Sequence, residues 1–195
     1  AIDEIKWIKN KDGLDVMYAN GPTDSVQPLP ETYSKYKNIA GEATVTADTE
    51  ATDVGALTDG LLSMQKMFGF ADFVKETAIT KTTSFTFDFA EAKTIRALMI
   101  YNSKDVEAMF LNARVEFICE QADGTTITKV IKNIAFDAEQ YCSKSEFSGK
   151  YTYIMSGAAA VSEFNELKAK SVKITVSVPE GQEKVGLSEI RILGR

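Results

Sequence analysis

Few residue types in this chain of 195 residues could do chemistry at neutral pH, because it contains no histidine. That absence excludes Ser-His-Asp triads, Cys-His pairs and zinc sites with imidazole ligands. Acid–base work would fall to carboxylates, lysine or tyrosine, and two well-spaced carboxylates suffice to cleave a glycoside. Most of the 28 Asp and Glu residues, however, fall in turns or on polar strand faces, as Asp12, Asp123 and Glu180 do. The sequence therefore favours a protein that is not an enzyme.

Aromatic and polar side chains between predicted strands form a second chemical set. A pyranose ring has apolar C–H faces and a polar rim, so aromatic rings beside amides and charges suit it, and loops display such residues. Tyr101, Asn102 and Lys104 lie where a predicted strand opens into a loop, and Phe68 and Phe70 lie in an earlier loop. We expect these five residues to contact a ligand. The alternative is that the phenylalanines fill one end of the core.

Composition limits the partners. Hydrophobic residues make up 44% and charged residues 26% of the chain, which suits a packed core. The net charge of −6 repels phosphate backbones, so we expect no nucleic acid partner. No apolar run is long enough to cross a bilayer, so we expect no membrane insertion. Cys119 and Cys142 could be buried thiols or a disulfide, and the sequence does not choose between them.

The N-terminal region predicts a β-hairpin. Apolar residues alternate over residues 4–8 and 14–18, on either side of the turn signal Asp12-Gly13. Three of the four prolines follow before residue 31, and proline favours an extended path. We interpret residues 1–36 as the end of a preceding domain plus a linker. The chain begins without an initiator methionine or a signal peptide, so we expect any export signal to lie outside it.

From residue 37 onward the pattern is typical of strands separated by turns. Phe85, Phe87 and Phe89 alternate onto one face, and Val172 to Val178 alternate again. These strands predict an all-β fold, an antiparallel β-sandwich or jelly roll. Further strands are predicted over residues 43–47, 95–101, 114–121, 125–134 and 187–193, and short helical turns over residues 54–62, 106–112 and 161–167.

Four stretches resemble the galactose-binding-like superfamily, which includes discoidin (factor five/eight type C) domains and related carbohydrate-binding modules. Each stretch is common by itself, and their order and spacing carry the resemblance. The stretches are Asn38–Ala40 with Ala43–Ala47, Ala56–Gly60, Phe85–Phe89 through Ile95, and Ala169–Ile174 with Leu187–Gly194.

The resemblance implies a β-sandwich over residues 37–195 and a non-catalytic carbohydrate-binding module. Such modules belong to larger bacterial carbohydrate-active proteins, such as glycoside hydrolases, that are secreted, periplasmic or on the cell surface. The implied partners are a glycan or polysaccharide and neighbouring domains of the same polypeptide. The alternative is a β-sandwich that orients its neighbouring domains without binding sugar.

The resemblance also implies a structural calcium ion. Members of the superfamily often bind calcium with oxygen ligands, where the Asp-Gly turn meets the closing strand. Asp59 matches the turn aspartate and Glu189 the closing-strand glutamate, so we expect these two residues to hold the ion. The sequence departs from the pattern at Leu61, where a second acidic residue is frequent. The alternative is that Asp59 forms an Asx turn and Glu189 is hydrogen-bonded at the sheet end.

Overall fold

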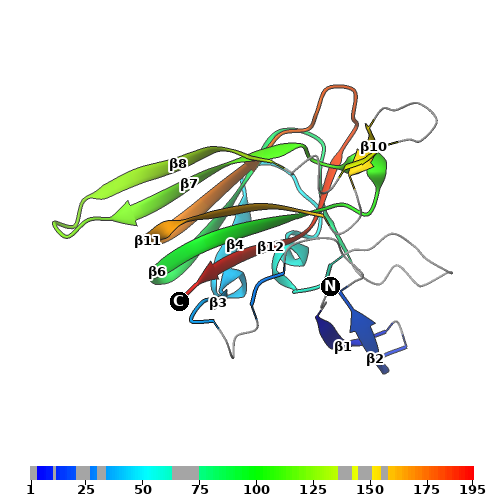
Figure 1. The fold of residues 1–195 in the computed structure, drawn as a ribbon, viewed down its shortest axis with the longest axis horizontal. Coiled ribbons are helices and arrows are strands. Elements are labelled where there is room, and N and C mark those ends of the chain that lie inside the picture. The colour runs from blue at the N-terminus through cyan, green and yellow to red at the C-terminus, as the bar shows by residue number, and fades with distance from the viewer. Residues whose placement is uncertain are drawn as a thin grey trace.

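The chain forms an antiparallel β-sandwich with a two-stranded hairpin beside one end, as the computed structural model shows (Figure 1). The structure describes residues 4–10, 12–20, 27–29, 34–62, 75–135, 142–144, 151–154 and 158–195. The strands are β1 (Ile5–Lys9), β2 (Asp15–Ala19), β3 (Lys37–Asn38), β4 (Thr44–Ala47), β5 (Thr77–Ile79), β6 (Thr83–Asn102), β7 (Asn112–Glu120), β8 (Thr126–Ala135), β9 (Cys142–Lys144), β10 (Tyr151–Ile154), β11 (Ala159–Val176) and β12 (Val185–Gly194). Short 3₁₀ turns are η1 (Ala40–Glu42), η2 (Val54–Thr58) and η3 (Val106–Ala108).

The predicted N-terminal hairpin is present as β1 and β2. Trp7 pairs with Met17 and Lys9 with Asp15, so these four side chains lie on one face of the hairpin. Gly13 in the connecting turn has a φ of +77°, a left-handed conformation that glycine adopts without steric cost.

Two long strands, β6 and β11, pair along their whole length and belong to both layers of the sandwich. The first half of β6 pairs with β4, whereas its second half pairs with β12. In β11, register shifts fall between Glu163 and Leu167 and between Ala169 and Ser171, where the strand passes from one layer to the other. Strands β7 and β8 extend the first layer beyond β11, and β3 and β5 pair with β12 in the second. The predicted antiparallel β-sandwich is confirmed.

The core lies between the two layers and follows the predicted alternation. Phe85, Phe87 and Phe89 of β6 are at most 2% exposed, and Val172 and Ile174 of β11 are fully buried. Burying one such side chain stabilises the fold by about 1.5–3 kcal/mol, so β6 and β11 together supply much of the driving force for folding.

The structure describes the side chain of one of the two cysteines. Cys119 is a buried free thiol on the core face of β7. Cys142 begins β9, and its side chain lies outside the described residues. Burial raises the pKa of the Cys119 thiol, which keeps it protonated and unreactive at neutral pH.

The helical predictions were partly wrong. The turns expected over residues 54–62 and 106–112 contain η2 and η3, but residues 161–167 lie in β11. Val161 pairs with Met99 of β6, and that pairing overrides the weak local helical signal. None of the helical segments in the described ranges has the length and apolarity needed to span a bilayer.

Candidate functional site

The turn after η2 packs against the closing strand β12, as the sequence predicted. The backbone N–H of Gly60 donates a hydrogen bond of 3.0 Å to Oε2 of Glu189, which is fully buried. The other carboxyl oxygen, Oε1, lies 3.5 Å from the side-chain amide of Asn38. Asp59 accepts a bond of 2.8 Å from the N–H of Leu61, which is an Asx turn.

Burial dominates the electrostatics of these two acids. Loss of water raises the pKa of Glu189 to about 8, and the neighbouring Asp59 charge adds to the rise. The bond from Gly60, the Arg191 guanidinium and the Lys6 ammonium act in the opposite direction and lower that pKa only in part. Burial also raises the pKa of Asp59, against the Leu61 bond and the Lys6 charge. Burial therefore outweighs the nearby positive charges and favours the protonated form of Glu189.

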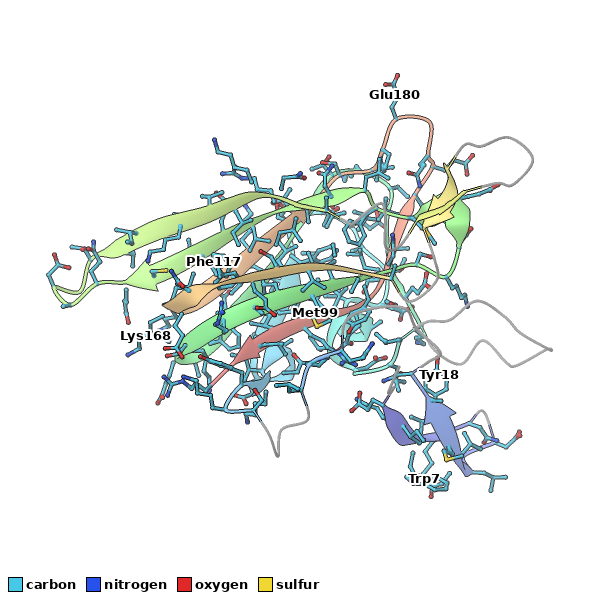
Figure 2. The ribbon with its side chains drawn as sticks, in the orientation of Figure 1. Trp7, Tyr18, Met99, Phe117, Lys168 and Glu180 are labelled. Carbon is cyan, nitrogen blue, oxygen red and sulfur yellow. The ribbon has the colours of Figure 1, made fainter. Side chains whose placement is uncertain are left out.

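The N-terminal hairpin closes this cluster from outside. Asn20, only 1% exposed, donates to the carbonyl of Gly60 at 2.8 Å and accepts from the N–H of Leu62 at 2.9 Å. The Tyr18 hydroxyl donates to the carbonyl of Leu62. In Figure 2 the Tyr18 side chain lies on the side of the hairpin toward the sandwich, and Trp7 lies on the opposite side. Residues far apart in the sequence thus share one hydrogen-bonded cluster.

An ion pair and a close approach complete the contact. Arg191 of β12 is 5% exposed, and its Nη2 lies 3.2 Å from Oε2 of Glu4. The Lys6 Nζ lies 2.0 Å from the position that a Cβ on Gly60 would occupy. Gly60 has a φ of +76°, a left-handed conformation that favours glycine.

The residues of this cluster do not fit a calcium ion. Calcium takes six to eight oxygen ligands, preferably several of them charged. Here the carbonyls of Gly60 and Leu62 and both oxygens of Glu189 already accept hydrogen bonds from protein donors. Within the described ranges, no three His, Cys, Asp or Glu side chains gather in a way that could hold a metal ion. The arrangement matches the alternative from the sequence, an Asx turn and a hydrogen-bonded glutamate.

The prediction that Tyr101 and Asn102 are displayed in a loop is wrong. Both lie at the end of β6 and are fully buried, because β12 continues the sheet alongside them through Leu187 and Glu189. The Arg191 guanidinium lies 5.2 Å from the centre of the Tyr101 ring. A ring covered in this way cannot stack on a sugar.

Asn102 instead closes the following loop. Its side chain accepts from the N–H of Phe110 at 3.0 Å and donates to the carbonyl of Phe110 at 3.3 Å. Lys104 is half-buried, and its backbone N–H donates to Oε1 of Glu76 at 2.9 Å. The Lys104 side chain is thus the part of this trio that approaches solvent. Phe68 and Phe70 fall outside the described residues.

A shallow groove that the sequence did not predict lies across β6, β11, β7 and β8, on the face of the first layer away from the core. Ser171 of β11 pairs with Asp88 on one side and with Ile118 on the other, so the three side chains form one row. The register shift before Ser171 falls at the groove, and such bulges re-aim side chains. The volume is about 340 Å³, and the lining residues are Asp88, Ile118, Glu120, Thr126, Lys170 and Ser171.

Comparison with solved structures identifies the fold. No family model matches the sequence, and no curated protein does either. The family 32 carbohydrate-binding module of Clostridium perfringens NanJ, solved with galactose, matches 79% of this chain and 95% of its own, with a TM-score of 0.51 and 10% identity. An F5/8 type C domain from Bacteroides fragilis matches 81% and 94%, with a TM-score of 0.50 and 7% identity. The chain has the galactose-binding-like fold.

A third match places this fold inside a larger enzyme. A Ruminococcus gnavus GH29 fucosidase, solved with fucose, aligns with 80% of this chain at a TM-score of 0.50 and 18% identity. The aligned part is 26% of the fucosidase chain. The galactose-binding-like fold predicted from four short stretches is confirmed, and the matches at these identities concern the fold alone.

The sequence alone indicates part of this groove. Asp88 stands between Phe87 and Phe89, and Ile118 between Phe117 and Cys119, so alternation alone assigns Asp88 and Ile118 to the outer face. The register that aligns them with Ser171 depends on the bulge in β11, which has no local sequence signal.

Proposed function

We propose that the chain is a non-catalytic glycan-binding module of a larger secreted carbohydrate-active protein, and that the groove across β6, β11, β7 and β8 holds the sugar. The observation that carries the proposal is the lining of that groove on a galactose-binding-like fold. We expect the parent protein to act outside the cytoplasm, at the surface or in the surroundings of a bacterium.

The chemistry of the groove supports this proposal. Its lining offers two carboxylates, one ammonium, two hydroxyls and one aliphatic side chain. Carboxylates and hydroxyls accept hydrogen bonds from sugar hydroxyls, the ammonium donates, and the aliphatic group suits a C–H face. A volume of about 340 Å³ lies at the lower end of the range for small-molecule sites. One or two sugar units of a longer chain would fit.

The same lining argues against hydrolysis. A glycosidase needs one carboxylic acid held protonated by an apolar, buried setting beside a second carboxylate. The carboxylates of the groove, Asp88 and Glu120, are both exposed. We therefore assign the groove to binding, which gives an attached enzyme avidity for a polysaccharide.

A specific observation favours a second candidate, a module that orients neighbouring domains. The outer face of the N-terminal hairpin exposes Ile5 at 59%, Trp7 at 72% and Met17 at 64%. Adjacent exposed apolar side chains on one face are typical of a contact surface. The burial of Tyr101 and Asn102 points the same way, since it removes the sugar contacts expected from the sequence.

Affinity electrophoresis against plant, mucin and microbial polysaccharides distinguishes the two candidates. We expect retardation by at least one glycan, and a loss of affinity of about tenfold or more in Asp88→Ala/Glu120→Ala, since two direct hydrogen-bond partners are removed. The matched control is Glu180→Ala, an exposed acid in the loop before β12 (Figure 2), which should bind like the wild type.

Two results would count against the groove. Retardation that is unchanged in the double variant but lost in Trp7→Ala would move sugar binding to the hairpin. No retardation by any glycan would favour the domain-orienting candidate, which predicts instead that Trp7→Ala weakens the contact with an adjoining domain of the parent protein.

A further inference from the structure

The junction of the η2 turn and β12 holds several oxygens of the kind that bind cations, and each accepts a hydrogen bond from a protein donor. Two carbonyls, those of Gly60 and Leu62, and the Glu189 carboxyl come together where the η2 turn meets β12. A buried oxygen is costly unless a hydrogen-bond donor or a cation faces it. The groups that face these oxygens therefore show how the junction is stabilised.

The donors come from the N-terminal hairpin. Asn20 binds the Gly60 carbonyl and the Leu62 N–H, and Tyr18 binds the Leu62 carbonyl. Both donors stand on β2 or directly after it, and Asn20 is almost fully buried. Each bond joins the hairpin to the sandwich, so the hairpin is fixed by specific polar contacts and not by apolar packing alone.

A positive charge comes from the same hairpin. The Lys6 Nζ lies over Gly60, at 2.0 Å from the place of a Cβ, and its charge acts on both Asp59 and Glu189. The Lys6 side chain is 29% exposed, whereas Lys9, on the opposite face of β1, is 64% exposed and pairs with Asp15 at 2.6 Å. One lysine of β1 is thus turned into the cluster and the other is turned to solvent.

We infer that Lys6, Tyr18 and Asn20 of the hairpin stand in place of a metal ion at the junction of the η2 turn and β12. The hairpin is then an integral part of the module, and the junction closes without a divalent cation. This inference is independent of whether the groove binds sugar, because the groove and the junction share no residue.

Thermal unfolding of the unmodified chain gives the first test. We expect the same Tm in millimolar calcium and in excess EDTA. A bound calcium ion at about one hundred times its Kd would raise the Tm of a domain of this size by roughly 5–10 °C. An increase of that size, or heat of calcium binding in titration calorimetry, would overturn the inference.

Amide exchange of two paired variants gives the second test. The Leu62 N–H donates to Asn20, so its hydrogen exchange reports hairpin docking directly. We expect Lys6→Met to speed that exchange by about tenfold or more through local opening, and Lys9→Met to leave it unchanged. The Val172 amide in the core serves as the internal reference for global stability. Equal Leu62 exchange in Lys6→Met and the wild type, at unchanged Val172 exchange, would overturn the role of Lys6.

Discussion

Glu189 and Glu166 each tie remote parts of the chain together, but in opposite surroundings. Glu189 is fully buried and accepts bonds from the Gly60 N–H and the Asn38 amide, neither of which carries a charge. Glu166 of β11 lies at the surface, where Lys35 and Arg195 approach it and the Tyr36 hydroxyl donates to it.

The pKa values of the two glutamates move in opposite directions for this reason. Burial raises the pKa of Glu189 to about 8. The hydrogen bonds from Tyr36 and Lys35 lower the pKa of Glu166 to about 2. Loss of water therefore decides the pKa of the buried Glu189, whereas hydrogen bonds and charges decide the pKa of the exposed Glu166. The comparison teaches that the buried cluster, whose hydrogen bonds are shielded from water, should hold its segments more firmly than the surface cluster, whose three ionic members stay in water.

The largest expected effect is a pH dependence of the free energy of unfolding that arises from Glu189. Because its pKa in the folded state is above its unfolded value of 4.5, the folded chain binds more protons between these two values. The stability is then fully present below about pH 4.5 and falls as the pH rises through about 8, by at most about 5 kcal/mol. Urea unfolding between pH 5 and 8 should show this fall, and Glu189→Gln should flatten it.

The surface glutamate supplies the control for that experiment. Glu166→Gln should keep the wild-type slope between pH 5 and 8, because the lowered pKa of Glu166 places its titration below that window. A flat wild-type profile, or a slope unchanged in Glu189→Gln, would show that Glu189 is ionised in the folded state and would remove the contrast between the clusters.

The next effect concerns Asn20, which joins the hairpin to the buried cluster. Asn20→Ala leaves the Gly60 carbonyl and the Leu62 N–H without their partner in a buried place, which should cost about 2–3 kcal/mol. The matched control is Asn10→Ala. The Asn10 side chain also makes two bonds to the backbone, both as acceptor, but in the exposed turn of the hairpin, so its loss should cost about 1 kcal/mol or less. Equal urea midpoints for the two variants would contradict the view that burial gives the docking contact its strength.

Sequence reasoning reached the turn and the closing strand of this cluster but not the hairpin that packs on them. The Asp-Gly turn and the closing strand could be recognised from local patterns, and the structure brings Gly60 and Glu189 together. Nothing local indicates that Lys6 and Asn20 would meet that turn, because the docking face of a hairpin depends on the surface it packs against. The sequence thus brought the turn and Glu189 together, and it missed the hydrogen-bond donors that the hairpin supplies.

The error at Tyr101 has a similar origin. The sequence predicts that a strand opens into a loop at Tyr101 and Asn102, yet β12 pairs alongside β6 and extends the sheet over both residues. The buried Ser103 hydroxyl donates to Glu76, and the buried Asn102 side chain accepts from the Phe110 N–H. Alternation along the strand indicates neither partner. Alternation predicts which face a residue takes, whereas strand ends are set by tertiary partners.

The smallest expected effect is that of Glu166 itself. Its lowered pKa means that any stability it contributes is present above about pH 4.5 and is lost as the pH falls toward 2. At neutral pH, water and salt screen the Lys35 and Arg195 charges, and ordering three long side chains has an entropic cost, so Glu166→Gln should leave the urea midpoint nearly unchanged. A change in the midpoint as large as that of Asn20→Ala, and insensitive to added salt, would mean that the surface cluster is held as firmly as the buried one. Three exposed charged groups would then stabilise the fold as much as the buried hydrogen bonds around Glu189. Burial would no longer explain which of the two clusters holds its segments more firmly.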